Sequence, residues 1–372
     1  MKICIDARMV SNSGIGVYIR NYTEYILKNN CFAEVILLGK KIDLNKAFGH
    51  FSNWRCHEMN VPIYSIKEQF VLPFLIPQCD IFWSPHYNIP LLPIRAKKRV
   101  VTLPDTAHLA LSEPFDFGLI KKLYANIVFK AATLLSDVIT TISEFSKNEI
   151  IKYTGVSPSK VHVILLGINS TLFEKITDEV LLIKTREKYK LPQKFILFVG
   201  NIKPHKNLSS LLDAFLIANS DIETYKLVIL GKKEGFITGD GKVFEKINEN
   251  KVLQEKVIFT GYVAEEDLPT IYNLASLFVF PSIYEGFGFP PLEAMACGCP
   301  VVCSNSASLP EVCGESVLYV NPTNASEIAA IIVKVADDEK LKDVLIQKGI
   351  IQSKKYVWEQ SAIQFIDCLK NK

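Results

Sequence analysis

The stretch SLFVFPSIYEGFGFPPLEAMACGCPVVCSN (residues 276–305) decides the fold of this chain. Its two ends, 276–282 and 299–305, are short runs rich in apolar and β-branched residues, which predict buried strands. The middle begins as a glycine-rich loop and continues as a helix that starts near Pro290 and Pro291, because proline is favoured in the first turn of a helix. A strand, a helix and a second strand in this order predict a βαβ unit and hence a parallel sheet.

The same alternation of strands and helices runs along the chain in two series. The first series has strand-like runs at 2–10, 33–39, 79–85, 99–105 and 137–143. The second series has them at 194–200, 225–231, 256–262, 276–282 and 299–305. Two such series predict an α/β protein with two doubly wound parallel-sheet domains. A charged segment at 173–193 separates them, so the predicted domains are residues 1–175 and 176–355.

Length and composition agree with two folded domains. The chain has 372 residues, 49% of them hydrophobic, and no apolar run reaches the roughly 18 residues that span a bilayer. The first residues, MKICIDARMV, place Asp6 and Arg8 inside an apolar stretch, which is typical of a buried strand and not of a signal peptide. The protein is therefore predicted to be cytoplasmic.

The net charge of +3 is unevenly spread. Residues 1–175 carry 20 Lys+Arg and 14 Asp+Glu, a net of +6, and the remainder carries 22 and 25, a net of −3. The basic half favours an acidic or membrane-surface partner. The chain shows no basic helix, zinc finger or aromatic–basic sheet signature, so no nucleic-acid partner is predicted.

Nine cysteines, an odd number, match no disulfide framework. Four of them gather late in the chain, but the C-x-C-x3-C spacing of 297–303 lacks the C-x2-C pairs of zinc sites. These cysteines are predicted to be small, reduced, buried residues.

Two glutamates flank the glycine-rich loop of the opening stretch. Glu293 falls in the predicted first turn of the helix, where its charge would stabilise the helix dipole by roughly 0.3–1 kcal/mol. That explanation does not account for Glu285, or for the bare N–H groups of Gly286 and Gly288 beside the same helix end. Together these residues predict an anion cradle flanked by two hydroxyl acceptors, which suits a diphosphate with a sugar on each side.

A second glycine loop follows the first predicted strand. In SNSGIGVYIRN, Gly14 and Gly16 precede a predicted helix, so backbone N–H groups can approach a phosphate, although turns of this kind often contain glycine without a ligand. Position 19 is Ile19, so the G-x-G-x-x-G fingerprint is incomplete, and no acidic residue ends the second strand. Both features disfavour a nicotinamide-dependent oxidoreductase.

A basic loop follows the first strand of the second series. In FVGNIKPHKNL, Lys203, His205 and Lys206 lie between that strand and a helix. Lysines in this place can neutralise a diphosphate, and the alternative is an ordinary solvated turn.

The E-x7-E stretch resembles the motif of family 4 of the retaining glycosyltransferases, which have the GT-B fold. The resemblance continues, in order, through SGIGVYIRN, FVGNIKPHKNLSSLLDAF, the whole of 261–305, SLPEVCGESVLYVNP and YVWEQSA. It implies two Rossmann-like domains that face a central cleft. It also implies that the C-terminal helix, 356–372 around Trp358, crosses back onto the first domain.

The resemblance implies roles for the donor-binding residues. Glu293 would bind the ribose of the nucleotide. Glu285, with the backbone of Gly286, Phe287 and Gly288, would hold the hydroxyls of the transferred sugar. Lys206 would pair with the diphosphate, and the Gly14–Gly16 loop would close over it from the other domain.

The chain departs from the family pattern at two places. Asn201 stands where many members carry an arginine, so the charge on the diphosphate falls to Lys206 with help from Lys203. Many members also carry a His-Asp pair after the fourth strand, but here Pro104 precedes the expected catalytic Asp105. Two other histidines are candidates for the acceptor side, His86 and His108.

The resemblance also implies the reaction. The acceptor attacks the anomeric carbon on the face that the diphosphate leaves, and the departing phosphate oxygen takes its proton. The chain has no Asp-x-Asp motif, so no essential metal and no cofactor are expected. The stretches quoted above are most similar to bacterial polysaccharide-assembly members, which suggests mannose from GDP-mannose as the donor, with UDP-sugars left open.

The expected acceptor is a growing glycan on a lipid carrier. Segments 66–77 and 117–135 combine apolar residues with Lys67, Lys121, Lys122 and Lys130, which suits an anionic membrane surface, although core helices with solvated lysines are an alternative. Two other functions stay open. Pro104 and Asn201 keep a non-catalytic sugar-nucleotide binder open as an alternative, and a nicotinamide-dependent oxidoreductase has less support.

Overall fold

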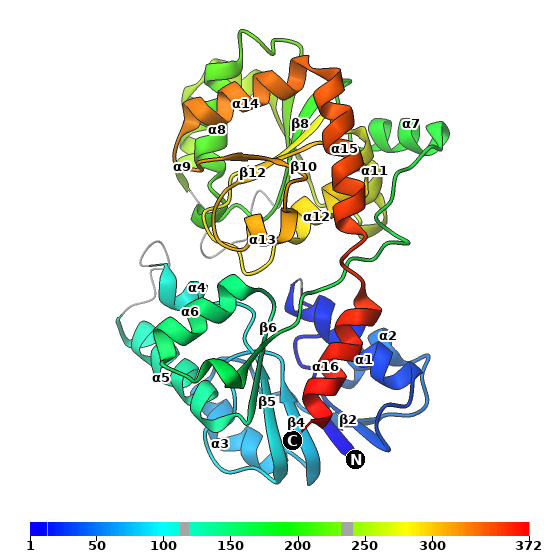
Figure 1. The fold of residues 1–372 in the computed structure, drawn as a ribbon, viewed down its shortest axis with the longest axis vertical. Helices are drawn as coiled ribbons and strands as arrows, with labels where there is room; N and C mark the ends of the chain where they lie inside the picture. Colours follow the sequence, from blue (N-terminus) through cyan, green and yellow to red (C-terminus); the bar gives the residue numbers. More distant parts are fainter. Residues whose placement is uncertain (13, 112–118, 232–240, 372) are drawn as a thin grey trace. The chain divides into compact units, whose positions relative to one another are not determined.

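The computed structural model describes residues 1–12, 14–111, 119–231 and 241–371, with the side chains of 119–122 left out. The chain divides into two compact units (Figure 1). The first unit comprises Met1–Gly167 and Trp358–Lys372, and the second comprises Ile168–Val357. Each unit is a parallel sheet covered by helices, as the alternation of strands and helices predicts.

The first unit contains a seven-stranded sheet of order β3-β2-β1-β4-β5-β6-β7, in which all neighbouring strands pair in parallel. The strands are β1 (Lys2–Asp6), β2 (Glu34–Gly39), β3 (Arg55–Glu58), β4 (Cys79–Ser84), β5 (Ala96–Thr102), β6 (Val138–Thr141) and β7 (Val161–Val163). The helical segments are α1 (Ile15–Lys28), α2 (Lys41–Phe48), α3 (Ile66–Leu75), α4 (Ala107–Ala110), α5 (Leu119–Leu135), α6 (Glu144–Thr154), η1 (Pro158–Lys160) and α16 (Trp358–Lys370).

The C-terminal helix α16 belongs to the first unit, where it lies beside α1 (Figure 1). The ring of Phe365 stacks on Tyr22 with centroids 4.5 Å apart and lies 4.6 Å from the ring of Trp83 on β4. All three side chains are fully or almost fully buried. Aromatic burial of this kind attaches the last helix to the sheet.

The second unit contains a six-stranded parallel sheet of order β10-β9-β8-β11-β12-β13. Its strands are β8 (Phe195–Val199), β9 (Lys226–Leu230), β10 (Val257–Gly261), β11 (Leu277–Phe280), β12 (Val301–Ser304) and β13 (Leu318–Val320). The helical segments are α7 (Glu179–Lys188), η2 (Pro204–Lys206), α8 (Leu208–Ala218), α9 (Gly241–Glu249), α10 (Lys251–Lys256), η3 (Glu265–Asp267), α11 (Leu268–Leu274), α12 (Phe289–Ala296), α13 (Leu309–Cys313), α14 (Ala325–Asp337) and α15 (Glu339–Ser353).

Both sheets reverse their strand order beside their first strand. In the first unit β1 lies between β2 and β4, and in the second β8 lies between β9 and β11. This arrangement confirms the predicted doubly wound topology. Ligands of such sheets bind beyond the carboxyl ends of the strands at the point of reversal. A ligand is therefore expected at the loops after β1, β4, β8 and β11.

The structure also adds three short edge strands that the sequence pattern did not indicate: β3, β7 and β13. All nine cysteines are free thiols, and the four of the late group are buried. Among the described residues, no helix is both long and apolar enough to cross a membrane.

Candidate active site

The loop between β11 and α12 has a tightly constrained backbone. Gly288 precedes the helix with a φ of 116°, a backbone conformation that favours glycine, and a Cβ there would also require the side chain of Leu309 to move. The hydroxyl of Ser308 lies 2.9 Å from the carbonyl oxygen of Glu285 and 2.7 Å from that of Phe287. The two hydrogen bonds from Ser308 fix the backbone of this loop, and the Glu285 side chain extends from that fixed backbone.

Lys206 and Glu285 form an ion pair at the point of strand reversal. The Lys206 Nζ lies 2.5 Å from Glu285 Oε1, and the two side chains are only 17% and 12% exposed. The same ammonium lies 5.2 Å from the ring centroid of Phe280, the last residue of β11. A cation and a carboxylate are therefore positioned together at the carboxyl ends of β8 and β11.

Backbone contacts hold the loops after β8 and β11 against each other. The carbonyl oxygen of His205 accepts from the N–H of Ile283 at 2.8 Å and from the hydroxyl of Ser282 at 3.0 Å. Burial, followed by the positive charge of Lys206, lowers the pKa of His205 to about 4, so its ring is neutral at physiological pH. Lys203, in the same loop, is half-buried, whereas Asn201 is exposed.

Glu293 does not lie in the first turn of α12. The helix begins at Phe289, so Glu293 is one turn further on, and the proposed interaction with the helix dipole is wrong. Its Oε2 accepts a hydrogen bond from the hydroxyl of Tyr272 at 3.0 Å. Burial raises the pKa of Glu293 to about 7, and the Tyr272 hydrogen bond only partly opposes this shift. Near neutral pH the carboxyl group can therefore accept or donate a hydrogen bond.

A pocket of about 370 Å³ in the second unit lies at the opposite edge of its sheet. Its lining includes Lys194, Ser276 and Pro300, which precede β8, β11 and β12. None of the predicted donor-binding residues lines this pocket.

In the first unit the glycine loop is arranged differently from the prediction. Gly14 directly precedes α1 with a φ of 71°, but Gly16 lies inside the helix. A Cβ at Gly16 would lie 2.7 Å from the carbonyl oxygen of Val10 and 2.9 Å from that of Met9. The loop packs closely on the helix start, and this packing accounts for glycine at position 16.

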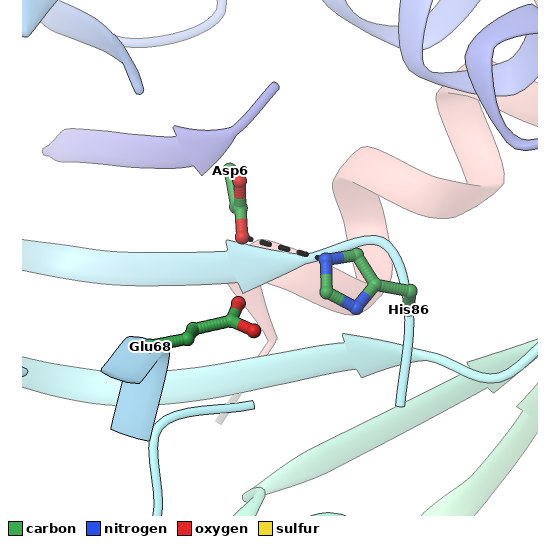
Figure 2. Close-up of side chains that lie close together, drawn as sticks. All are labelled: Asp6, Glu68 and His86. Carbon is green, nitrogen blue, oxygen red and sulfur yellow. Dashed lines mark ion pairs between the residues drawn. The ribbon is translucent and has the colours of Figure 1, made fainter. Parts of the chain in front are cut away.

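A buried ionic cluster lies at the carboxyl end of β1 (Figure 2). Asp6 ends the strand, Glu68 comes from α3 and His86 follows β4; each is at most 1% exposed. The guanidinium of Arg8 donates to both oxygens of Asp6, at 2.8 and 2.5 Å, and to Glu68. Burial alone would raise the pKa of Asp6, but the charge and hydrogen bonds of Arg8 outweigh it and hold that pKa well below its usual range.

Asp6, Glu68 and His86 have the composition of a metal site, since their ligand atoms lie within 4.8 Å of one another. Arg8, however, already hydrogen-bonds to both carboxylates and so takes the place of a cation. The Nδ1 of His86 accepts from the N–H of Asn88 at 3.2 Å, and its Nε2 lies 3.5 Å from Asp6 Oδ2. This arrangement suits a salt-bridged anchor and not metal ligation.

The loop after β5 carries Asp105 and His108. Oδ1 of Asp105 accepts from the N–H of Ala107, the first residue of α4, at 2.9 Å. The carbonyl oxygen of Pro104 accepts from the hydroxyl of Ser146 at 2.9 Å. The ring of His108 lies 5.4 Å from that of Tyr87, which follows β4.

Sequence reasoning missed three residues that contact predicted ones or each other: Arg8, Glu68 and Tyr272. For Arg8 a signal existed, because a charge inside an apolar strand requires a buried partner. The other two gave no signal, since their partners are distant in sequence.

Family models match almost the entire chain. Residues 183–352 match the model described as Glycosyl transferases group 1, and residues 12–172 match Glycosyltransferase Family 4. The O-antigen chain mannosyltransferase B of Escherichia coli is 31% identical over 291 residues, which are 78% of this chain and 74% of that protein. The chain belongs to the family 4 glycosyltransferases.

Two further proteins resemble this glycosyltransferase. The serotype-specific mannosyltransferase WbdA of Escherichia coli is 33% identical over 232 residues, which are 61% of this chain and only 28% of WbdA. The structure of Anabaena Alr3699/HepE in complex with UDP and glucose superposes with a TM-score of 0.77 at 17% identity, over 100% of both chains. At that identity the likeness is one of fold, and the fold is GT-B.

Proposed function

We propose that this glycosyltransferase transfers mannose from GDP-mannose, with retention and without a metal, onto a growing cell-surface polysaccharide. The observation that carries the proposal is the Lys206–Glu285 pair at the strand reversal of the second unit, with Glu293 on the adjoining helix. The printed names of the relatives, O-antigen chain mannosyltransferase B and WbdA, support mannose. A UDP-sugar is the alternative donor, because HepE was solved with UDP.

The donor is proposed to bind across the loops after β8 and β11. Lys206, assisted by Lys203 and the exposed amide of Asn201, would hold the diphosphate. Glu285 and the backbone of 286–288 would bind the hydroxyls of the transferred sugar. The Glu293 carboxyl group would accept from a ribose hydroxyl, and its weak acidity lets it remain partly protonated until the ligand arrives.

The proposed chemistry is electrostatic. As the bond to the anomeric carbon breaks, negative charge grows on the diphosphate oxygen, and Lys206 stabilises it where it forms. That oxygen then removes the proton of the attacking acceptor hydroxyl on the same face, so the configuration is retained without a covalent sugar–enzyme bond. Asp105, held at the start of α4, would orient the acceptor hydroxyl.

The acceptor is proposed to be lipid-linked and reached at the cytoplasmic face of the membrane. On α3 the exposed fractions are 72% for Ile66, 64% for Phe70 and 80% for Phe74. On α5 they are 62% for Leu123, 54% for Ile127 and 77% for Leu134. Large apolar side chains rarely gather on an exposed face without a partner.

The two helices are linked, and their charge suits an anionic lipid surface. Gln69 of α3 and Tyr124 of α5 both donate to Oδ1 of Asn88, at 3.3 and 3.2 Å. Lys67 and Lys130 are exposed on the same helices. The side chains of the other predicted lysines, 121 and 122, lie outside the described residues. Buried core helices, the alternative explanation of these segments, do not account for the exposed phenylalanines.

A donor and acceptor screen tests the function. The purified protein is incubated with GDP-mannose or UDP-sugars and a short mannose oligosaccharide, with and without EDTA. We expect transfer from GDP-mannose that EDTA does not change, and an anomeric signal in the product that shows retention. Inversion, or loss of transfer in EDTA, would contradict the proposed mechanism. Donor binding without transfer or hydrolysis would favour the non-catalytic binder.

A further inference from the structure

Tyr64 has a strained backbone. Its φ of 62° lies in the left-handed region, which bulky side chains rarely adopt. Its N–H donates to Oε2 of the buried Glu68 at 3.0 Å, and the next residue, Ser65, caps α3 by accepting from the N–H of Glu68 at 3.2 Å. Strain of this kind persists only where the surroundings enforce it, and it is common at ligand sites.

The strained backbone presents an aromatic ring to solvent. Tyr64 is 43% exposed, yet its ring stacks on Tyr87 with centroids 5.3 Å apart and planes 28° apart. The ring of His86 lies 5.8 Å away in an edge arrangement. Because Tyr87 covers one face of the Tyr64 ring, only the opposite face and the edge remain for a ligand. The result is a flat aromatic surface with a rigid support.

The surroundings of this ring are acidic. Burial and then the charges of Glu68, Asp105 and Asp6 raise the pKa of Tyr64 to about 12, so its hydroxyl keeps its proton. Asp6 ends β1, and Asp105 follows β5, which places the ring at the carboxyl edge of the first sheet. That edge is where doubly wound sheets bind ligands.

We propose that the exposed face of Tyr64, supported by Tyr87, binds a hexopyranose ring of the acceptor glycan. The negative face of an aromatic ring attracts the weakly positive C–H groups of a sugar. His86 and His108, the predicted acceptor-side histidines, contact these two tyrosine rings. The proposal rests on the proposed function and adds a specific contact for the acceptor.

The test compares three variants with a short soluble mannose oligosaccharide as acceptor. Tyr64→Asn removes the ring and tolerates the left-handed backbone, Tyr64→Phe keeps the ring, and Ile42→Ser removes an exposed apolar side chain from α2 of the same unit. We expect the acceptor KM to rise about tenfold in Tyr64→Asn and to stay within about twofold in the other two. The donor KM should not change in any of them.

An acceptor KM in folded Tyr64→Asn within about twofold of wild type would overturn the proposal. A second measurement does not depend on that variant: saturating acceptor should shift the ring signals of Tyr64 in the NMR spectrum of the wild-type protein, and unshifted signals would also overturn it. A wild-type protein that transfers sugar from no nucleotide sugar contradicts the proposed function instead. If the wild-type protein transfers sugar normally and Tyr64→Asn has an unchanged acceptor KM, only the proposed contact between Tyr64 and the acceptor is contradicted.

Discussion

Lys206 and Glu285 are 79 residues apart in sequence, yet Nζ and Oε1 lie 2.5 Å apart. Each group holds the other in a fixed, largely buried position before any ligand arrives. In the proposed mechanism the donor diphosphate forms an ion pair with Lys206. The carboxylate of Glu285 then becomes available to bind sugar hydroxyls. The pair would therefore preorganise both halves of the donor site.

Removal of Lys206 should nearly abolish transfer. Lys206→Ala takes away the charge that stabilises the leaving group and leaves Glu285 unpaired, so we expect the rate to fall by about 10²–10³-fold. Calorimetry should also show weaker binding of nucleoside diphosphate. Lys188→Ala, which breaks the more exposed pair with Asp267, is the matched control and should change neither quantity. A near-normal rate for Lys206→Ala would contradict the assignment.

The two glutamates should differ in their effects. Glu293→Ala should weaken binding of nucleoside diphosphate, since a ribose hydroxyl loses its acceptor. Glu285→Ala should lower the turnover number while the nucleotide remains bound. Calorimetry measures nucleotide affinity and initial rates measure turnover, so the two variants can be distinguished. Wild-type affinity and turnover in both variants would disprove the E-x7-E assignment.

Glu293 should make stability depend on pH. Burial raises its pKa from 4.5 to about 7 in the folded protein, so the unfolded chain loses this proton first as the pH rises. The protonated carboxyl group contributes its full amount to the unfolding free energy below about pH 4.5. This contribution is lost as the pH rises through about 7. Between pH 5 and 8, wild type should lose about 2 kcal/mol more unfolding free energy than Glu293→Gln.

Denaturant unfolding of wild type and Glu293→Gln across this pH range measures the difference. Glu285→Gln serves as the control at the same site. Equal pH dependence in wild type and Glu293→Gln would mean that folding does not raise the pKa of Glu293.

Arg8 should be essential for the stability of the first unit. Arg8→Met leaves the carboxylates of Asp6 and Glu68 buried without their cation, a change that typically costs about 3–5 kcal/mol. We expect a large fall in melting temperature, and the second change Glu68→Gln should partly reverse it by removing one of the two charges. A melting temperature like that of wild type in Arg8→Met would show that the cluster does not anchor the fold.

The exposed face of α3 and α5 should bind anionic vesicles. The double variant Phe70→Ser/Phe74→Ser should co-sediment at least about tenfold less with phosphatidylglycerol vesicles, because it loses two exposed aromatic groups. Its unfolding free energy should stay within about 0.5 kcal/mol of wild type, since both side chains are exposed. Ile351→Ser, at a 64% exposed position on α15, is the control and should bind like wild type.

Pro104→His tests the departure from the family pattern. The backbone carbonyl of Pro104 keeps its bond to Ser146 whichever side chain is present, so we expect the variant to fold. Initial rates should hold or rise if the donor pocket otherwise resembles that of the family. Complete loss of activity in a folded variant would mean that the pocket is organised around the proline.

Local sequence was sufficient to predict both sheets. Buried strands such as 195–199 and 277–280 are continuous apolar runs, and the loops after them begin with Gly200 and Pro281. Both signals are properties of neighbouring residues. The edge strands β3 and β7 escaped detection because they are short and their residues RCHE and VHV include polar ones.

Tertiary packing decided the details of the sites. The sequence placed Glu293 in a first turn and Gly16 before a helix, but the helices begin at Phe289 and Ile15, which local sequence did not reveal. Which apolar residues of α3 and α5 face water also depends on packing, because an apolar segment looks the same in sequence whether it is covered or exposed.

What the sequence by itself determined was the order of the elements, the two domains and the loops that carry charge at the ends of strands. Only the tertiary structure paired Lys206 with Glu285, placed Arg8 between Asp6 and Glu68, and set Tyr64 against Tyr87. The physical reason is distance along the chain: secondary structure follows from neighbouring residues, whereas the electrostatic free energy of a buried charge depends on the side chains that folding brings beside it.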